Sequence, residues 1–216
     1  MTESSEGGTT PLEDEPAIAE EIFGSHIPLV RRFVDNLDRE GELRGLIGPL
    51  ERQRLWSRHI LNCGVLASLI KPGNIGDVGS GAGLPGLVLA LMRPDASFVL
   101  IEPMERRVTW LKEQVAELGL ENVRVIRARS QDLGTRVQLD QVTARAVSSL
   151  KKLLPLTTPL LRDGGELLLM KGSSVHDEIT AARKELNFHK VHDVEVLVLG
   201  EGKLVDVTRV LRAKVR

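Results

Sequence analysis

A cluster of glycines follows an acidic residue in the segment GDVGSGAGLPG, residues 76–86. Asp77 closes a short β-like run, and Gly79, Gly81 and Gly83 let the backbone adopt unusual dihedral angles close to a ligand, because no Cβ stands in the way. The Leu-Pro pair that follows suits the first turn of a helix whose N-terminus would face that ligand. Glycine-rich turns of this kind hold dinucleotides or S-adenosylmethionine, so the segment predicts a cofactor loop.

Spacing alone leaves the choice of cofactor open. Residues 81–86 satisfy the dinucleotide pattern G-x-G-x-x-G, and Glu102 ends the next predicted strand 21 positions after Gly81, where a ribose-binding acid is expected. A tight packing turn without any ligand is a further reading of the same glycines. A dehydrogenase would also need a His or Tyr to relay a proton, but the chain has no tyrosine and His59 lies outside the predicted sheet.

Alternating strand-like and helix-like segments surround this loop. The short β-like runs are NIGDVGS, SFVLIEP, NVRVIRA, QVTARAV and GELLLMKG. The helical stretches between them, typical of right-handed βαβ units and a mainly parallel sheet, lie at 84–92, 105–118, about 130–138 and 149–162. Two alternating runs on either side of residues 200–202 predict a C-terminal antiparallel hairpin. The predicted fold is therefore α/β.

The sequence before the sheet divides into two parts. Residues 1–15 are polar, acidic and poor in apolar side chains, so we expect a disordered acidic tail. Residues 16–72 carry apolar residues at helical spacing, with a break near Gly24, and they predict a long helix after Pro49 with one buried side. We interpret them as an N-terminal helical extension that forms one compact unit with the sheet domain, residues 73–216.

Composition and charge favour a cytoplasmic protein that tolerates a polyanionic partner. The net charge is −1, but the first 21 residues hold seven acids and no Lys or Arg, so residues 22–216 contain all 29 basic and only 23 of the 30 acidic side chains. No apolar run approaches the roughly 20 residues that cross a bilayer, and the N-terminus lacks the pattern of a signal peptide.

One cysteine, Cys63, fits a reducing compartment and is expected in the core. We expect no metal, because no second His or Cys accompanies His59 at metal-ligand spacing.

Six segments resemble, in the same order, the motifs of one enzyme family. They are RLWSRHILNC (54–63), DVGSGAGLPG (77–86), EP followed by RR (102–107), RARSQD (127–132), ARAVSSL (144–150) and MKG (170–172). Together they resemble the bacterial small-subunit ribosomal RNA methyltransferase G family, also called glucose-inhibited division protein B, over roughly residues 20–213. The resemblance implies a Rossmann-like class I methyltransferase sheet, S-adenosylmethionine as cofactor, and methylation of N7 of a guanosine in 16S rRNA of the small ribosomal subunit.

The resemblance also assigns residues to the cofactor. They are Asp77, Gly79, Ser80, Gly81, Gly83, Leu84, Glu102, Ser130, Gln131 and Arg145. It implies that Glu102 accepts hydrogen bonds from both ribose hydroxyls, although an acid at this place could instead cap the following helix. Ser130 and Gln131 match the adenine position, where the family more often has Ala-Glu, and Ala144 stands where Ser is frequent. The chain therefore lacks the carboxylate at the adenine position and the hydroxyl beside Arg145.

Arg145 is the predicted catalytic residue. It ends the fourth predicted strand, and open α/β sheets place ligand contacts at the carboxyl ends of their strands. A guanidinium inside VTARAVSSL also needs a cleft for its charged head, because arginine is rarely buried without a partner. Its planar fork could hold a guanine edge or a phosphate. A surface arginine at a strand end is the alternative.

The predicted RNA contacts are Arg54, Arg58, His59, Arg129 and Lys171. The first three share a basic helix with Trp56, which could stack on a base or, as tryptophan in an amphipathic helix more often does, join the core. A solvated charged face, and for Lys171 a solvated strand end, are the alternatives.

Guanine N7 carries a lone pair and no proton, so its methylation needs no strong general base, and the sequence offers no obvious one. We expect a monomer, and the alternative function is a class I methyltransferase that acts on a small molecule or a protein.

Overall fold

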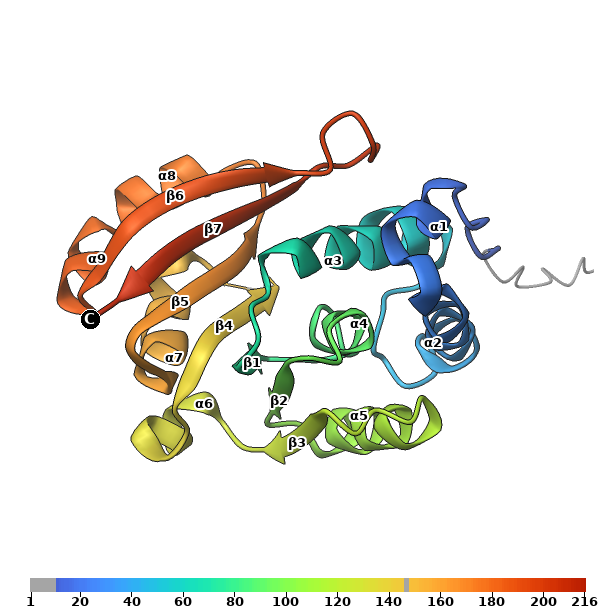
Figure 1. Cartoon of the computed structure of the whole chain (residues 1–216), viewed down its shortest axis with the longest axis horizontal. Helices are drawn as coiled ribbons and strands as arrows, with labels where there is room; N and C mark the ends of the chain where they lie inside the picture. Colours follow the sequence, from blue (N-terminus) through green and yellow to red (C-terminus); the bar gives the residue numbers. More distant parts are fainter. Residues whose placement is uncertain (1–10, 146–147) are drawn as a thin grey trace, which may run out of the picture.

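The computed structural model describes residues 11–145 and 148–216. Its centre is a seven-stranded sheet with the strand order β3-β2-β1-β4-β5-β7-β6 (Figure 1). The strands are β1 (Asn74–Val78), β2 (Ser97–Glu102), β3 (Val123–Arg127), β4 (Leu139–Arg145), β5 (Leu161–Lys171), β6 (Val191–Leu199) and β7 (Thr208–Val215). Strands β1 to β5 pair in parallel, and β7 lies antiparallel between β5 and β6. The mainly parallel sheet with a C-terminal antiparallel hairpin is confirmed.

Helices cover both faces of this sheet (Figure 1). One side carries α1 (Ile18–Phe23), α2 (Ile27–Glu40), the helical segment 52–69, α4 (Gly86–Met92) and α5 (Glu105–Glu117). The other side carries α7 (Leu150–Thr157), α8 (Val175–Ala181) and α9 (Arg183–Phe188), while the short α6 (Ser130–Leu133) leads towards β4. Alternate residues of β5 follow this division, with Leu168 and Met170 in one core cluster and Leu167 and Leu169 in the other. In the part of the chain that the structure describes, no helix has the length and apolar character needed to cross a membrane.

The helices α8 and α9, which connect β5 to β6, were not predicted. Each is short, and α8 buries only Val175 while α9 buries only Leu186. So few apolar positions give almost no periodic signal, and short helices of this kind depend on packing against the rest of the protein. The connection between β6 and β7 also spans residues 200–207, which is longer than the predicted turn.

The helical extension shares its hydrophobic core with the sheet. Phe23 and Leu66 belong to the same cluster of buried side chains as Leu100 of β2 and Leu168 of β5. The break predicted in the first helical segment is a 3-10 turn at Gly24–His26, between α1 and α2. The extension and the sheet bury their apolar side chains against each other. Side chains of the extension therefore have fixed positions relative to the sheet.

Residues 52–69 are helical throughout, but they do not form the regular helix that the sequence predicts. They run through a 3-10 turn (Arg52–Arg54), a π-helical turn (Leu55–Ile60), α3 (Leu61–Gly64) and a second 3-10 turn (Val65–Leu69). The pattern of apolar residues specifies which side is buried, but not whether a hydrogen bond spans three, four or five residues. Single π-helical turns often occur at functional sites, and this one carries His59.

The predicted acidic tail lies partly within the described structure. Its residues 1–10 lie outside the described residues. The Glu13 amide donates to the carbonyl oxygen of Arg52 (3.0 Å), and the Glu13 carboxylate accepts from the amide of Ser57 (3.0 Å). These two hydrogen bonds hold Glu13 against the start of segment 52–69.

Candidate active site

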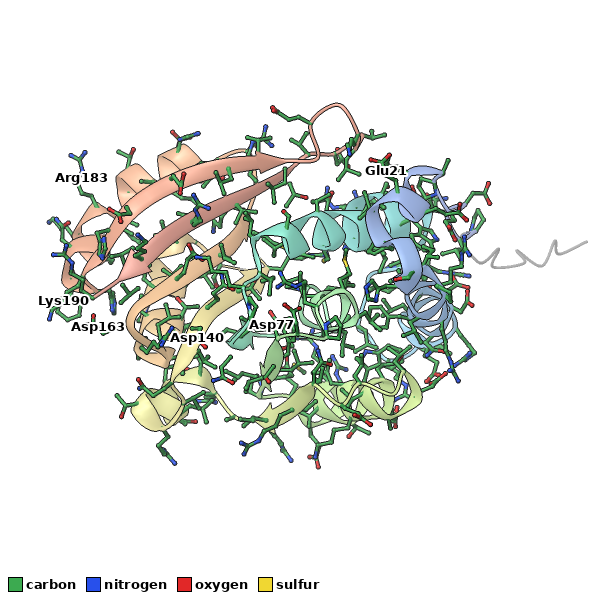
Figure 2. The ribbon with its side chains drawn as sticks, in the orientation of Figure 1. Glu21, Asp77, Asp140, Asp163, Arg183 and Lys190 are labelled. Atoms are coloured by element: carbon green, nitrogen blue, oxygen red, sulfur yellow. The ribbon has the colours of Figure 1, made fainter. Side chains whose placement is uncertain are left out.

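The glycine loop lies where the sheet reverses its winding, between β1 and β4. Strand β1 pairs with β2 on one side and with β4 on the other, and Asp77 lies opposite Thr143 of β4. Figure 2 marks Asp77 in the middle of the molecule. The loop that follows β1 and Arg145 at the end of β4 therefore leave the sheet side by side at its carboxyl edge. Open α/β sheets bind their ligands at this switch point.

Hydrogen bonds to its main-chain groups hold the glycine loop in place. The amide of Gly79 donates to the Ile101 carbonyl oxygen of β2 (2.9 Å), and the indole N–H of Trp110 in α5 donates to the Ala82 carbonyl oxygen (3.0 Å). Gly79 and Gly81 have φ angles of 73° and 55°, in the left-handed region that side chains with a Cβ disfavour. The loop is thus fixed from β2 and α5 while its own residues remain beside open space.

Gly86 and Asp77 show why the first turn of α4 packs so closely on β1. A Cβ at Gly86 would lie 2.4 Å from Leu100 Cδ2 and 2.5 Å from Asp77 Oδ2, so only glycine allows this close packing. The Gly86 amide donates to Asp77 Oδ2 (3.2 Å). Asp77 Oδ1 is buried, and among the described residues it has no hydrogen-bond partner. Burial raises the pKa of Asp77 to about 7.

The Glu102 carboxylate binds backbone amides of the glycine loop and of the segment before α5. Its side chain is buried, Oε2 accepts from the Gly81 amide (3.0 Å), and Oε1 accepts from the Met104 amide just before α5 (3.0 Å). The guanidinium of Arg107 lies 4.0 Å from Oε2. A carboxylate has about four lone-pair sites, so two acceptor positions remain for further donors. Both readings of Glu102 are compatible with this geometry, and the ribose contact stays a prediction.

Two neighbouring cavities lie at this edge of the sheet. The smaller, about 260 Å³, is lined by residues 79–82 of the glycine loop and by Leu84 and Arg107 among others. The larger, about 720 Å³, lies among the π-helical turn, the end of β5 and the start of β7. Glu51, His59 and Arg145 line both cavities. We call these three residues the dividing wall.

The dividing wall is a chain of polar side-chain contacts. One guanidinium nitrogen of Arg145 contacts His59 Nδ1, and another lies 3.8 Å from Cys63 Sγ. His59 Nε2 contacts the Glu51 carboxylate, which also pairs with Arg54. Burial, together with the charge of Arg145, lowers the pKa of His59 to about 4, and burial raises the pKa of Cys63 to about 11. The imidazole and the thiol are therefore both neutral at neutral pH.

Comparison with known proteins identifies the family. The model of the GidB family, described as rRNA small subunit methyltransferase G, matches residues 26–206. The rRNA small subunit methyltransferase G of Leifsonia xyli subsp. xyli (strain CTCB07) is 64% identical over 208 residues, which cover 96% of this chain and 100% of that protein. The chain belongs to the rRNA small subunit methyltransferase G family. It is an enzyme, a methyltransferase that uses S-adenosylmethionine.

Solved structures show the same fold. M. jannaschii TYW2 in complex with AdoMet has a TM-score of 0.55 at 21% identity, covering 74% of this chain and 76% of that chain. A SAM-dependent O-methyltransferase from Thermotoga maritima has a TM-score of 0.54 at 16% identity, covering 71% and 64%. The Rossmann-like class I methyltransferase fold predicted from the sequence is confirmed.

The glycine loop and its surroundings fit the cofactor of the rRNA small subunit methyltransferase G family. Gly79, Ser80, Gly81 and Leu84 line the smaller cavity, and their contact with the cofactor stays a prediction. Asp77 Oδ1, which has no hydrogen-bond partner among the described residues, is a buried polar atom close to them. The other predicted cofactor residues do not line this cavity: Asp77, Gly83, Glu102, Ser130 and Gln131. Ser130 and Gln131 begin α6, where Ser130 is buried and Gln131 is exposed. Their contact with adenine stays a prediction.

The residues predicted to bind RNA in this rRNA small subunit methyltransferase G family member occupy different surroundings. Arg58 is exposed and lines the larger cavity. Arg54 is exposed but paired with Glu51, and Arg129 is exposed before α6, outside the lining of both cavities. Lys171 differs most from expectation: its side chain is 1% exposed, and its ammonium pairs with Glu178 (2.6 Å) and donates to the Ser148 carbonyl oxygen (3.0 Å).

Lys171 nevertheless lines the larger cavity. Its contact with RNA stays a prediction, and the alternative of a solvated strand end is wrong, because the side chain is buried and paired. The same Glu178 carboxylate accepts from the Leu150 amide at the start of α7 (2.8 Å). Lys171 and Glu178 thus tie the end of β5 to Ser148 and the start of α7.

The prediction that Trp56 and Cys63 lie in the core is confirmed. Trp56 is 3% exposed and lies against Phe23, and Cys63 is fully buried.

Sequence reasoning missed several residues of the site. Glu51 belongs to the dividing wall, Arg107 lines the smaller cavity, and Asp206 and Arg209 line the larger one. Arg107 is the second arginine of the RR pair that follows EP in segment 102–107, but no spacing rule linked it to the loop. Arg209 comes from β7, and only the insertion of β7 beside β5 brings it to the site. Among the described residues, no group of three or more His, Cys, Asp or Glu is placed to hold a metal ion.

Proposed function

We propose that the protein transfers a methyl group from S-adenosylmethionine to N7 of a guanosine in 16S rRNA of the small ribosomal subunit. Family membership supports the methyltransferase class and the RNA. The observation that carries the proposal is that two cavities, one of them lined by the glycine loop, share the wall that bears Arg145. This arrangement suits transfer of a small group from a ligand in one cavity to a ligand in the other.

The chemistry of the dividing wall supports an acceptor that needs no general base. When bound, S-adenosylmethionine supplies an electrophilic methyl group on a cationic sulfur. Guanine N7 presents a lone pair and no proton, so alignment and exclusion of water are sufficient. The two nitrogens of His59 are already engaged, and burial keeps the Cys63 thiol protonated. Neither side chain serves as base or nucleophile in this arrangement.

We assign the smaller cavity to the cofactor and the larger to the guanosine with its neighbouring phosphates. The backbone of the glycine loop and Glu102 hold the cofactor in this assignment. Arg58, Arg145 and Arg209 supply positive charge to the larger cavity, against the acids Glu51 and Asp206. Guanidinium groups bind phosphate and the guanine edge through paired donors.

Arg145 is the proposed catalytic residue because it touches both cavities. Its guanidinium is proposed to hold guanine O6 or a phosphate rather than N7, since the methylated base acquires positive charge and a cation on N7 would oppose the reaction. Folded RNA hides its N7 edges in a deep and narrow groove, so the target lies in a loop or a distorted helix. Arg54 and Arg129 are proposed to contact phosphates outside the two cavities.

We further propose that the enzyme acts as a monomer in the cytoplasm and without a metal ion. Direct attack by N7 requires neither a Lewis acid nor a second subunit. Methyl transfer by the isolated protein, measured with and without added metal and at several protein concentrations, tests both proposals.

Transfer of labelled methyl groups tests the proposed function. The substrates are small-subunit particles and free 16S rRNA from cells that lack this enzyme. Nucleoside analysis of the labelled RNA follows the reaction. We expect labelled 7-methylguanosine, and the more reactive substrate shows whether the enzyme recognises RNA or an assembled particle. Absence of transfer to both, with cofactor binding intact, would discard the rRNA assignment and favour a small-molecule or protein substrate.

A further inference from the structure

Arg145, at the end of β4, meets the other two residues of the dividing wall, which belong to the helical extension. Glu51 lies directly before the helical segment 52–69, and His59 lies in its π-helical turn. Arg145 contacts His59 Nδ1 across a separation of 86 positions, and His59 Nε2 contacts the Glu51 carboxylate. The three side chains form one continuous series of contacts between the two cavities.

The chemistry of the three groups gives this series a direction. A carboxylate only accepts hydrogen bonds, and a guanidinium only donates them. The imidazole between them must therefore carry its proton on Nε2 and offer the lone pair of Nδ1 to Arg145. A protonated ring would have no acceptor for Arg145 and would repel it. The buried position of His59 and the neighbouring guanidinium both disfavour that form.

His59 is more deeply buried than the arginine that it meets, since Arg145 is only partly buried. His59 is 6% exposed, and Leu55 and Ile60 of the same helical turn are fully buried. Among the described residues, the Arg145 guanidinium has one further polar contact, with Cys63 Sγ at 3.8 Å, and a thiol is a weak acceptor. His59 is thus the strong and fixed acceptor that determines where the guanidinium points.

We propose that Glu51 and His59 are positioning residues that orient the Arg145 guanidinium between cofactor and substrate. Glu51 fixes the tautomer of His59, His59 fixes the guanidinium, and Arg145 touches the substrate. The inference rests on the proposed function, which assigns Arg145 to the guanosine. It also gives His59 a role other than the RNA contact that the sequence predicts, because both of its ring nitrogens are engaged within the protein.

Two substitutions of His59 separate its two contacts. The amide of asparagine places an acceptor near the position of Nδ1, whereas the amide of glutamine reaches the position of Nε2. We expect His59→Gln to lower kcat about 10-fold and His59→Asn to stay within about threefold, because misplaced catalytic groups cost rate steeply. Cofactor affinity should change less than about threefold in both, since the glycine loop is held without His59. His176→Asn, at an exposed site of α8, is the matched control.

A double-mutant cycle and two substitutions of Glu51 complete the test. In the Arg145→Ala background, His59→Gln should cause less than about a twofold further loss of kcat, because residues that act through one another are not additive. Glu51→Ala should lower kcat about fivefold. Glu51→Gln should restore most of that loss, since its amide oxygen still accepts from Nε2–H. Glu42→Gln, at an exposed site of the same extension, is the control for the charge.

Equal kcat values for His59→Asn and His59→Gln, or multiplicative losses in the cycle, would overturn the inference. Wild-type protein that methylates neither form of 16S rRNA would overturn the proposed function instead. The ring ¹⁵N chemical shifts of His59 then test the inference separately in the folded wild-type protein. The Nε2–H tautomer with a hydrogen-bonded Nδ1 is expected, and the Nδ1–H tautomer would contradict it.

Discussion

The two sides of the candidate site are held in place by different groups. Main-chain groups hold the glycine loop: the Gly79 amide bonds to β2, and the Ala82 carbonyl oxygen receives the indole N–H from α5. Charged and polar side chains hold the dividing wall, where Glu51, His59 and Arg145 contact one another in series. The loop therefore depends on backbone conformation and close packing, whereas the wall depends on the protonation state and direction of side chains.

This difference suits the two ligands that we assign to the site. A cofactor that is the same in every turnover can be held by a rigid loop at little entropic cost. The dividing wall must meet the cofactor on one side and a much larger RNA on the other, so it carries groups that form directional hydrogen bonds. Damage to the loop should appear first as lost stability and cofactor binding, and damage to the wall as lost rate.

The largest effect should follow from Gly86→Ala on the loop side. The new Cβ would lie within 2.5 Å of Asp77 Oδ2 and 2.4 Å of Leu100, so α4 must move away from β1. We expect the free energy of unfolding to fall by about 3 kcal/mol and cofactor affinity to weaken. Urea denaturation and calorimetry measure the two effects. Gly172→Ala, where a Cβ meets no atom within 4 Å, should leave stability unchanged.

The pH dependence of stability should also report on the loop side, through Asp77. Burial raises its pKa from 3.8 to about 7, so the folded state binds this proton more tightly than the unfolded state. The stabilising contribution is complete below the unfolded value and is lost as the pH rises through about 7. Between pH 5 and 8.5, wild-type stability should fall by about 2.5 kcal/mol relative to Asp77→Asn.

Urea denaturation of both proteins at the two pH values measures this difference. The opposite trend from His59, whose folded pKa of about 4 removes stability as the pH falls below 6.5, is common to both proteins and cancels in the comparison. Parallel pH profiles for wild type and Asp77→Asn would mean that Asp77 is ionised throughout this range in the folded protein.

Arg145→Ala should affect rate rather than stability. We expect kcat/KM for 16S rRNA to fall about 50-fold, because the guanidinium that meets both cavities is removed from the dividing wall. Steady-state methyl transfer and thermal unfolding measure the two properties. Arg162→Ala, which removes an exposed partner of Asp140 away from the site, is the control. An unchanged methylation rate and cofactor affinity would contradict the catalytic role of Arg145.

The smallest effect is expected from Arg58→Gln at the rim of the larger cavity. Arg58 is exposed, so its contribution to RNA binding should be electrostatic and screened by salt. Affinity for RNA should fall about threefold at moderate salt, and the slope of log affinity against log salt should decrease by about one. Filter binding at several salt concentrations measures both, with Arg183→Gln in α9 as a control on another surface (Figure 2).

Much of the fold was accessible from the sequence because it depends on local pattern. The alternation of short apolar runs with helical stretches predicted the parallel strands, and the two alternating runs near residue 200 predicted the antiparallel hairpin. The helices α8 and α9 were missed because each buries a single side chain. The π-helical turn was missed because apolar spacing does not report the length of a hydrogen bond.

The sequence by itself determined the cofactor loop, since glycines at 79, 81 and 86 meet backbone and packing constraints that lie within one βα unit. It also determined that an arginine ends β4. Only the tertiary structure decided what that arginine meets. Glu51 and His59 come from the helical extension and Arg209 from β7, and long-range packing brings them to one sheet edge. Side-chain contacts across such separations leave no local pattern, because each depends on the geometry of two elements at once.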